Sequence, residues 1–490
     1  MSYFIISLDS GTTSARAVLF DEAGEAVAIE QKEFEQIFPE SGWVEHDPME
    51  ILEAQTEVLD ALLALSVSST KPVIALGITN QRETAVVWDR ETGKPVYNAI
   101  VWQDKRTAEV CAELKSGGLG AYCKKATGLV LDPYFSGTKI QWILDKVEGA
   151  RDRAERGELC FGTVDSWLLW NLTGGEIHAT DVSNASRTLL YNIVDMCWDK
   201  HMLSVLNIPR AILPEVRESA SVFGLHKGIP IAAIMGDQQS ALFGGTCFTP
   251  GTAKNTYGTG CFMLMNTGSK ISDTPSGLLN TVAWQIGGET TYALEGSVFV
   301  AGAALQWLRD GLGIIEKTSD SEEIARREAE LHEDSSVIVV PAFAGLGTPY
   351  WDMNAKGSIM GLTRDTGAGA ITRATLESLA YSSMDVLKAM QEDSGISLFT
   401  LQVDGGASAN NYLMQFQADL LGVGIERPAC VERTAAGVAY MAALTMGEKT
   451  LPELKTMRSI DSTFTPSKPV EWRETKSKLW EDAVNRVRTE

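Results

Sequence analysis

The stretch that decides the fold runs from Ile5 to Phe20 and reads I-I-S-L-D-S-G-T-T-S-A-R-A-V-L-F. Two apolar runs, residues 5–8 and 17–20, flank a turn made of small hydroxyl residues, one glycine, a carboxylate and a cation. Two short apolar runs around a glycine-containing turn predict a β-hairpin. The first question is what ligand, if any, such a turn would bind.

Phosphate is the ligand that this turn suits best. Backbone N–H groups and hydroxyls of Thr12, Thr13 and Ser14 can donate to phosphate oxygens, and Arg16 supplies a positive charge. Asp9 is placed to hold Mg²⁺ through water, because this ion tends to keep its hydration shell. Taken alone, the stretch also fits an ordinary polar hairpin turn.

A second hairpin of the same layout occurs halfway along the chain. Residues 254–265 read K-N-T-Y-G-T-G-C-F-M-L-M, again a strand, a Gly-Thr-Gly turn and an apolar strand. We therefore predict two domains of related design, residues 1–245 and 246–490, with Gly244-Gly245 as a flexible joint. One phosphate-binding hairpin from each domain indicates ATP held in a cleft between them.

A third glycine cluster, residues 403–411 (V-D-G-G-A-S-A-N-N), follows a predicted strand. Its glycines would allow an adenine ring to lie against the backbone. A plain strand-to-helix connection capped by Asp404 or Ser408 explains the cluster equally well.

Composition excludes several classes of function. The chain has 490 residues, of which 44% are hydrophobic, and its formal net charge is −22. This charge argues against nucleic acid or an anionic membrane as the main partner. No uncharged apolar stretch approaches the ~18 residues that span a bilayer, and Asp9 interrupts the N-terminal apolar run, so we expect no signal peptide. Seven scattered cysteines without a CxxC pair suit a reducing compartment, and we expect a soluble cytoplasmic protein.

The common nucleotide-binding motifs are absent from the sequence. It has no GxxxxGK[ST] loop, no GxGxxG motif opening a βαβ unit, and no HRD or DFG set. A P-loop enzyme and a protein kinase are therefore excluded. Strand-like runs alternate with helical patterns, which predicts an α/β architecture. Local signals predict a helix beginning at Asp47-Pro48, a hairpin of residues 85–88 and 96–102, and a terminal helix over 472–487.

Candidate substrate residues lie at the ends of predicted strands. Asp237 follows the apolar strand 229–235 and is either a general base or a helix N-cap. Arg82 and Glu83 follow the strand 72–79, and a donor beside an acceptor suits the hydroxyls of a polyol. The aromatic residues Trp102, Tyr134 and Phe262 could cover a carbon skeleton, although aromatic residues more often belong to the core.

Several blocks of sequence, in order and with matching spacing from about residue 7 to 443, resemble the FGGY carbohydrate kinases, and several are typical of the glycerol kinases within that family. The blocks are DSGTTSAR (9–16), GWVEHDP (42–48), ITNQRET (78–84), YNAIVWQ (97–103), DPYFSGTK (132–139), GDQQSALFG (236–244), NTYGTGCFML (255–264), GLGTPYWD (345–352) and VDGGA (403–407).

The resemblance implies two actin-like (ribonuclease H-like) domains that phosphorylate glycerol with ATP and Mg²⁺, giving sn-glycerol 3-phosphate in glycerol catabolism. It also implies a homo-oligomer, either a dimer or a tetramer. Asp237 would be the base that accepts the proton of the glycerol hydroxyl. The other implied site residues fall into four groups: Arg82, Glu83, Tyr134 and Gln238 for the hydroxyls, with Trp102 and Phe262 on the carbons; Thr12, Thr13, Ser14, Arg16 and Thr259 for the phosphates; Gly302, Gln306, Gly406 and Asn410 for the nucleoside; and Asp9 for Mg²⁺.

Two alternatives remain open at this point. One is a family member that acts on another polyol or sugar, and the other is an actin-like ATPase switch.

The sequence also departs from glycerol kinases in the segment before Asp237, which is only residues 223–229 here and lacks the usual regulatory patterns. We therefore expect His226 to be an ordinary surface residue.

Overall fold

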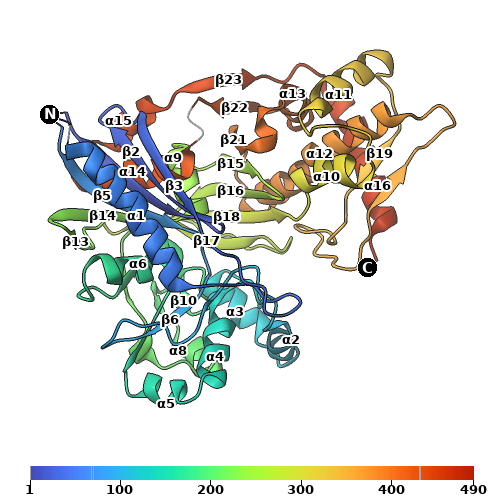
Figure 1. Ribbon diagram of the computed structural model, residues 1–490. Coiled ribbons are helices and arrows are strands. Elements are labelled where there is room, and N and C mark those ends of the chain that lie inside the picture. The colour runs from blue at the N-terminus through green and yellow to red at the C-terminus, as the bar shows by residue number, and fades with distance from the viewer. Residues whose placement is uncertain (1, 68, 70, 430–431, 490) are drawn as a thin grey trace.

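The computed structural model describes residues 2–67, 69, 71–429 and 432–489, and its helices are arranged around two mixed β-sheets (Figure 1). The first sheet has the strand order β13-β14-β5-β1-β2-β3. Its strands are β1 (Phe4–Ser10), β2 (Ser14–Asp21), β3 (Ala26–Glu33), β5 (Val73–Asn80), β13 (Gly224–His226) and β14 (Ile229–Gly236).

The opening stretch forms the predicted hairpin. Strands β1 and β2 pair antiparallel with Asp9 opposite Arg16, and β1 also pairs parallel with β5, which in turn pairs parallel with β14. Because parallel strands end at the same edge of a sheet, the residues that follow β1, β5 and β14 meet there. This pairing brings Asp9, Arg82 and Asp237 to one edge.

The second sheet repeats this topology. Its order is β17-β18-β16-β15-β21-β22-β23. Its strands are β15 (Thr252–Tyr257), β16 (Cys261–Gly268), β17 (Leu279–Ile286), β18 (Glu289–Val298), β21 (Thr400–Gly405), β22 (Gly424–Pro428) and β23 (Ile460–Phe464). In both sheets an antiparallel hairpin opens the sheet and its first strand pairs parallel with a later strand. The predicted duplicated α/β design, with two actin-like domains, is confirmed.

Helices cover the outer face of each sheet and fill the space between the sheets. On the first sheet, α1 (Pro48–Val67) and α6 (Val164–Leu172) share an apolar core with β1 and β5. On the second, α12 (Ala368–Ser394), α13 (Asn411–Leu421) and α16 (Val470–Val487) do the same with β15 and β16.

Two helices lie between the sheets, α9 (Asp237–Gly244) and α14 (Arg433–Thr445). Their core includes Ile5 and Val18 from the first sheet and Leu264 and Ala293 from the second. Although α14 belongs to the second half of the sequence, it packs against β1, β5 and β14. The apolar cores therefore do not divide at residue 246, and the boundary between 245 and 246 stays a prediction.

The segment between β6 and β12 forms the lower part of the molecule in Figure 1. Most of its helices pack around one apolar core, which also includes Leu279, Val282 and Tyr292 from β17 and β18. The remaining elements are β4 (Glu45–His46), β6 (Val86–Asp89), β7 (Ala99–Ile100), α2 (Ala108–Ser116), α3 (Gly120–Thr127), α4 (Ser136–Lys146), α5 (Ala150–Glu155), β8 (Leu159–Gly162), β9 (Ala179–Asp181), α7 (Val182–Ala185), β10 (Tyr191–Asn192), β11 (Cys197–Trp198), α8 (Lys200–Val205), β12 (Glu215–Arg217), α10 (Gly302–Gln306), α11 (Asp320–Leu331), β19 (Ile338–Val340), β20 (Ser358–Met360) and α15 (Leu451–Met457), with short turns of helix at 210–212, 307–311 and 406–409.

Of the three elements predicted from local signals, the two helices form, and the hairpin has a shorter second strand than predicted. The helix at Asp47-Pro48 is confirmed, and the Asp47 carboxylate accepts from the Met49 amide at 2.8 Å. The terminal helix begins at Val470, two residues before the predicted start. The predicted pairing of residues 85–88 with the following segment is confirmed, because Ala85 pairs antiparallel with Ile100 and Trp88 with Pro95. The second strand is shorter than predicted, since it covers only Ala99–Ile100, which also pairs with β4.

Two further expectations need correction or a different explanation. His226 is buried rather than on the surface, and its Nδ1 lies 2.9 Å from the Leu172 carbonyl oxygen. Gly244 ends α9 at the crossing with α14, where a Cβ atom would overlap the Arg433 carbonyl. Close helix packing, rather than a flexible joint, therefore explains the glycine at 244.

Cys430 lies outside the described residues. No helix in the described ranges has the length and apolar character needed to cross a membrane.

Candidate active site

Hydrogen bonds from the backbone and from a side chain fix the conformation of the first hairpin turn. The Gly11 amide donates to the Ser14 carbonyl at 3.0 Å, and the Gln81 side chain donates to the Gly11 carbonyl at 3.0 Å. Thr13 is exposed, whereas Ser14 is buried. Arg16 forms an ion pair with Glu432, beside the start of α14. The turn is thus fixed on one side and open at Thr13.

Asp9 lies at the edge where the strands of the first sheet end. Burial raises the pKa of its carboxyl group to about 6, against the opposing effect of the Arg16 cation, and the neighbouring Asp237 charge adds to the rise. A carboxylate with this environment is favoured in its charged form when a cation binds beside it.

Arg82, Glu83 and Asp237 form one cluster. The Arg82 Nε lies 3.2 Å from an Asp237 carboxylate oxygen and 3.8 Å from Glu83. The Asp237 side chain is 30% exposed, whereas those of Arg82 and Glu83 are at most 2% exposed. Glu83 has a φ of 63°, a left-handed conformation that non-glycine residues rarely adopt and that is often found at functional sites. The accessible carboxylate of the cluster is therefore Asp237.

The aromatic residues meet beside this cluster. The Trp102 ring centroid lies 5.5 Å from that of Tyr134 and 6.3 Å from that of Phe262, both edge to face. The Trp102 indole N–H donates to the Thr12 hydroxyl at 3.0 Å. Because Phe262 follows the second hairpin turn on β16, this group of aromatic rings draws on both halves of the chain, and Trp102 joins it to the first hairpin turn.

The second hairpin turn is tied to the start of α10. The Thr259 carbonyl accepts from the amides of Ala301 at 2.8 Å and Ala303 at 3.2 Å, and the Gly302 amide donates to the Gly258 carbonyl at 3.0 Å. Thr259 itself is exposed, as is Gln306 on α10.

The third glycine cluster lies against the end of β15. Gly405 has a φ of 84°, and a Cβ atom there would overlap the Tyr257 carbonyl, so this position requires glycine. Gly406 follows it and is exposed. Asn410 caps α13, accepting from the Leu413 amide at 2.9 Å, so its side-chain oxygen is already engaged.

Four residues that the sequence did not single out belong to the cluster. Glu295, Arg187 and Gln239 are all fully or almost fully buried, and Glu295 contacts both Arg82 and Arg187. Lys254 is also buried, and its ammonium group donates to the side chains of Gln238 and Thr256. One signal could have identified Glu295, because it is a lone charge inside the apolar strand pattern Y-A-L-E-G-S-V.

The carboxylates around the first hairpin turn allow Mg²⁺ to bind together with phosphate, but do not form a complete metal site by themselves. In the described part of the chain, no three His, Cys, Asp or Glu side chains gather to form a protein-only metal site. Mg²⁺ commonly uses one or two carboxylates together with substrate phosphate oxygens and water. Asp9 beside the first hairpin turn, with the buried and unpartnered Ser10 hydroxyl next to it, fits that pattern.

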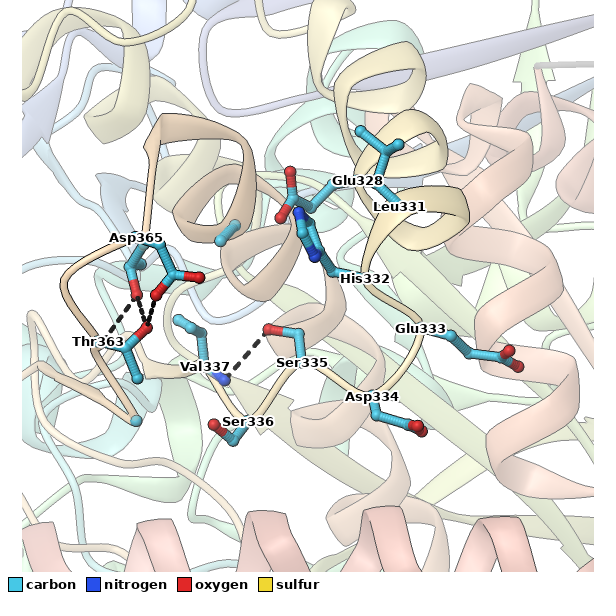
Figure 2. A pocket seen from close by; sticks show the side chains of 13 residues that line it. Glu328, Leu331, His332, Glu333, Asp334, Ser335, Ser336, Val337, Thr363 and Asp365 are labelled. Atoms are coloured by element: carbon cyan, nitrogen blue, oxygen red, sulfur yellow. Dashed lines mark hydrogen bonds between the residues drawn. The ribbon is translucent and has the colours of Figure 1, made fainter.

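A cavity of about 440 Å³ lies elsewhere in the molecule, between the end of α11 and the loop that precedes α12 (Figure 2). Glu328, Glu333, Asp334 and Asp365 contribute carboxylates to its lining. None of the predicted site residues lines it. An acidic lining disfavours a triphosphate, so this cavity is not the candidate nucleotide site.

Comparison with family models gives two adjacent matches. The N-terminal domain of the FGGY family of carbohydrate kinases matches residues 4–244, and its C-terminal domain matches residues 253–446.

Relatives match the chain over nearly its whole length. A glycerol kinase of Fusobacterium nucleatum is 57% identical, with 99% of each chain covered, and one of Alkaliphilus metalliredigens is 56% identical, with 99% of this chain and 98% of the relative covered. Among solved structures, the glycerol kinase of Plasmodium falciparum with ADP superposes with a TM-score of 0.95 at 36% identity, covering 99% of this chain and 98% of that one.

Proposed function

The chain belongs to the FGGY family of carbohydrate kinases, and from this premise we propose that it is a glycerol kinase, which transfers the γ-phosphoryl group of ATP to glycerol to give sn-glycerol 3-phosphate and ADP. The observation that carries the proposal is that the candidate acceptor site and the candidate phosphate site are in direct contact. Arg82, Glu83 and Asp237 form one polar cluster, and Trp102 beside it is hydrogen-bonded to Thr12 of the phosphate turn.

In this proposal Asp237 is the general base. Its carboxylate is the exposed one of the cluster, and Arg82 at 3.2 Å holds its orientation. It accepts the proton of the attacking hydroxyl as the oxygen forms its bond to the γ-phosphorus and the bond to the β-phosphate oxygen breaks. Arg82 and Glu83, with Tyr134 and Gln238, supply donors and acceptors for the hydroxyls of glycerol.

The remaining site residues position the reactants. Trp102 and Phe262 pack on the carbon chain and exclude water, which would otherwise accept the phosphoryl group. Thr12, Thr13, Ser14 and Arg16 hold the outer phosphates and Thr259 the inner ones. Gly302, Gln306, Gly406 and Asn410 surround the nucleoside.

Asp9 would hold the Mg²⁺ that ATP carries, with phosphate oxygens and water completing the shell. The ion would neutralise charge on the transferred group. Arg16 would have to exchange its partner Glu432 for a phosphate, and Lys254 adds a second cation close to Asp237.

The proposal also includes a cytoplasmic location and a homo-oligomeric state. The scattered cysteines support the first part, and size-exclusion chromatography with light scattering would measure the second.

The first experiment measures ADP release by the purified protein with ATP and Mg²⁺, offering glycerol, erythritol, xylulose, gluconate or no acceptor. We expect strong release only with glycerol, because Trp102 with Tyr134 and Phe262 around it would pack on a short carbon chain beside the polar cluster. Preference for a larger acceptor would show that glycerol is not the substrate, but it would still support kinase activity. Release without any acceptor would overturn the kinase proposal in favour of an ATPase switch.

A further inference from the structure

Glu295 is a buried charge in the middle of β18, in the second family domain, and its side chain is only 1% exposed. A carboxylate in such a place is unfavourable unless cations and hydrogen bonds compensate it. Two arginines do so. Arg82 donates to both carboxylate oxygens, at 2.6 and 3.2 Å, and Arg187 donates to one of them at 2.8 Å. Although burial raises the pKa of Glu295, these guanidinium groups lower it to about 2, so the residue is charged at neutral pH.

The contact with Glu295 sets the orientation of Arg82. A guanidinium group that binds a carboxylate through two nitrogens has a fixed plane. With Nη1 and Nη2 on Glu295, the Nε of Arg82 lies 3.2 Å from an Asp237 carboxylate oxygen, within ion-pair distance. Gln239 adds a further contact, accepting from Arg82 Nη1 at 3.2 Å.

Arg187 orients the Glu83 side chain in a similar way, because it binds Glu83 and Glu295 together. Its Nε donates to a Glu83 carboxylate oxygen at 2.6 Å while its Nη2 holds Glu295. The backbone of Glu83 has the unfavourable φ of 63°, and its carbonyl accepts from the Ser136 hydroxyl at 2.9 Å. Both the backbone and the side chain of Glu83 are therefore held by partners that lie far away in the sequence.

These four residues, which we call the buried charge network (Arg82, Glu83, Arg187 and Glu295), join the two family domains. Arg82 and Glu83 follow β5, whereas Glu295 comes from β18 in the second sheet. The glycerol-binding pair therefore has its geometry only when both domains are docked.

We propose that Glu295 and Arg187 are positioning residues for the acceptor site, Glu295 orienting Arg82 and Arg187 orienting Glu83, so that binding of the acceptor depends on a charge contributed by the other domain. This inference rests on the proposed function, which assigns Arg82 and Glu83 to the hydroxyls of glycerol. A positioning role predicts a selective defect in acceptor binding, whereas a role in stability alone predicts a uniform loss of activity.

The test uses Glu295→Gln in the full-length enzyme, with Glu295→Asp as the conservative variant and Glu289→Gln as the matched control. Glu289 begins the same strand and is exposed. For each protein we would measure KM for glycerol, KM for ATP, kcat, the Kd of glycerol by calorimetry and the Tm.

We expect Glu295→Gln to raise KM and Kd for glycerol by at least about 10-fold, because an arginine released from its carboxylate no longer presents one geometry to the hydroxyls. KM for ATP should stay within about 2-fold of the wild-type value. Glu295→Asp should recover part of the loss, and Glu289→Gln should behave as wild type. An unchanged KM for glycerol, or an equal rise in both KM values, would overturn the inference.

If Glu295→Gln does not fold, Arg187→Lys provides the second test, since it keeps the charge and loses the two-sided fork. The expected result is again a rise in KM for glycerol alone. If the wild-type enzyme prefers another acceptor, the proposed substrate is wrong, and the same variants are measured with that acceptor. A selective rise in its KM would then still support the positioning role.

Discussion

At the scale of single residues, Asp237 and its neighbours illustrate how burial and charge act against each other. Burial raises the pKa of Asp237, whereas the Arg82 and Lys254 cations lower it and Glu295 raises it further. The Asp237 charge in turn contributes to the raised pKa of Asp9. The direction that results is upward, as is common for catalytic bases that work near neutral pH.

Asp237→Asn tests the assignment of the base. The variant keeps the size of the side chain but cannot accept a proton, so we expect kcat to fall by about 10²–10⁴-fold. Binding of ATP should change little. The comparison is Asp482→Asn, an exposed aspartate of α16 that should leave kcat unchanged. Near-normal turnover of Asp237→Asn, measured by ADP release with glycerol, would contradict the role of a base.

The dependence of activity on pH follows from the same raised pKa. Asp237 must be ionised to accept a proton, so kcat/KM should fall as the pH drops through its pKa, at a higher pH than an ordinary aspartate near ~3.9 would give. Lys254→Met removes a cation that lowers this pKa, so the acid limb of the profile should move to higher pH. An acid limb that stays in place would show that another group controls it.

At the scale of elements, the crossing of α9 and α14 explains two glycines that have no role in the turns. Gly437 of α14 lies so close to α9 that a Cβ atom would overlap the Ser240 carbonyl, and Gly244 makes the reverse contact with Arg433. Backbones can approach this closely only where side chains are absent. The crossing brings α14 onto the helix that begins with Asp237.

Gly437→Ala tests this crossing. In an open helix the change would stabilise by about 1 kcal/mol through helix propensity. Here the overlap with a backbone carbonyl should outweigh that gain and lower the free energy of unfolding by about 1–3 kcal/mol. Urea denaturation followed by circular dichroism would measure it. Gly120→Ala in α3 is the control, because no atom lies within 4 Å of its Cβ position, and it should be neutral or stabilising.

At the scale of the whole molecule, the two family domains share apolar core as well as a site. The core around α9 and α14 draws on β1, β2 and β14 of the first sheet and on β16 to β18 of the second. Polar contacts also join the two domains, since the Ser7 hydroxyl of β1 donates to the Ala435 carbonyl of α14 at 2.6 Å. The two family domains are thus joined through the helix that begins with Asp237, the proposed base.

Separate expression of residues 1–245 and 246–490 tests this arrangement. Each fragment would expose the apolar surface that α9 and α14 share, so we expect both to aggregate alone and to form a soluble complex when expressed together. Sedimentation and thermal unfolding would measure the outcome. A fragment 1–245 that is soluble and unfolds cooperatively by itself would show that the first domain does not need α14.

Local patterns in the sequence determined the hairpins, the helix at Asp47 and the strand ends that carry Arg82 and Asp237, because alternation, turn residues and caps act within a few residues of one another. The family resemblance added roles for the site residues, which stay proposals. Tertiary structure alone decided the rest. Arg82 and Glu295 are separated by 213 residues and Arg187 and Glu83 by 104, and α14 crosses into the first half of the molecule. No local signal specifies such pairs, since they exist only after the two sheets have docked and removed both partners from water.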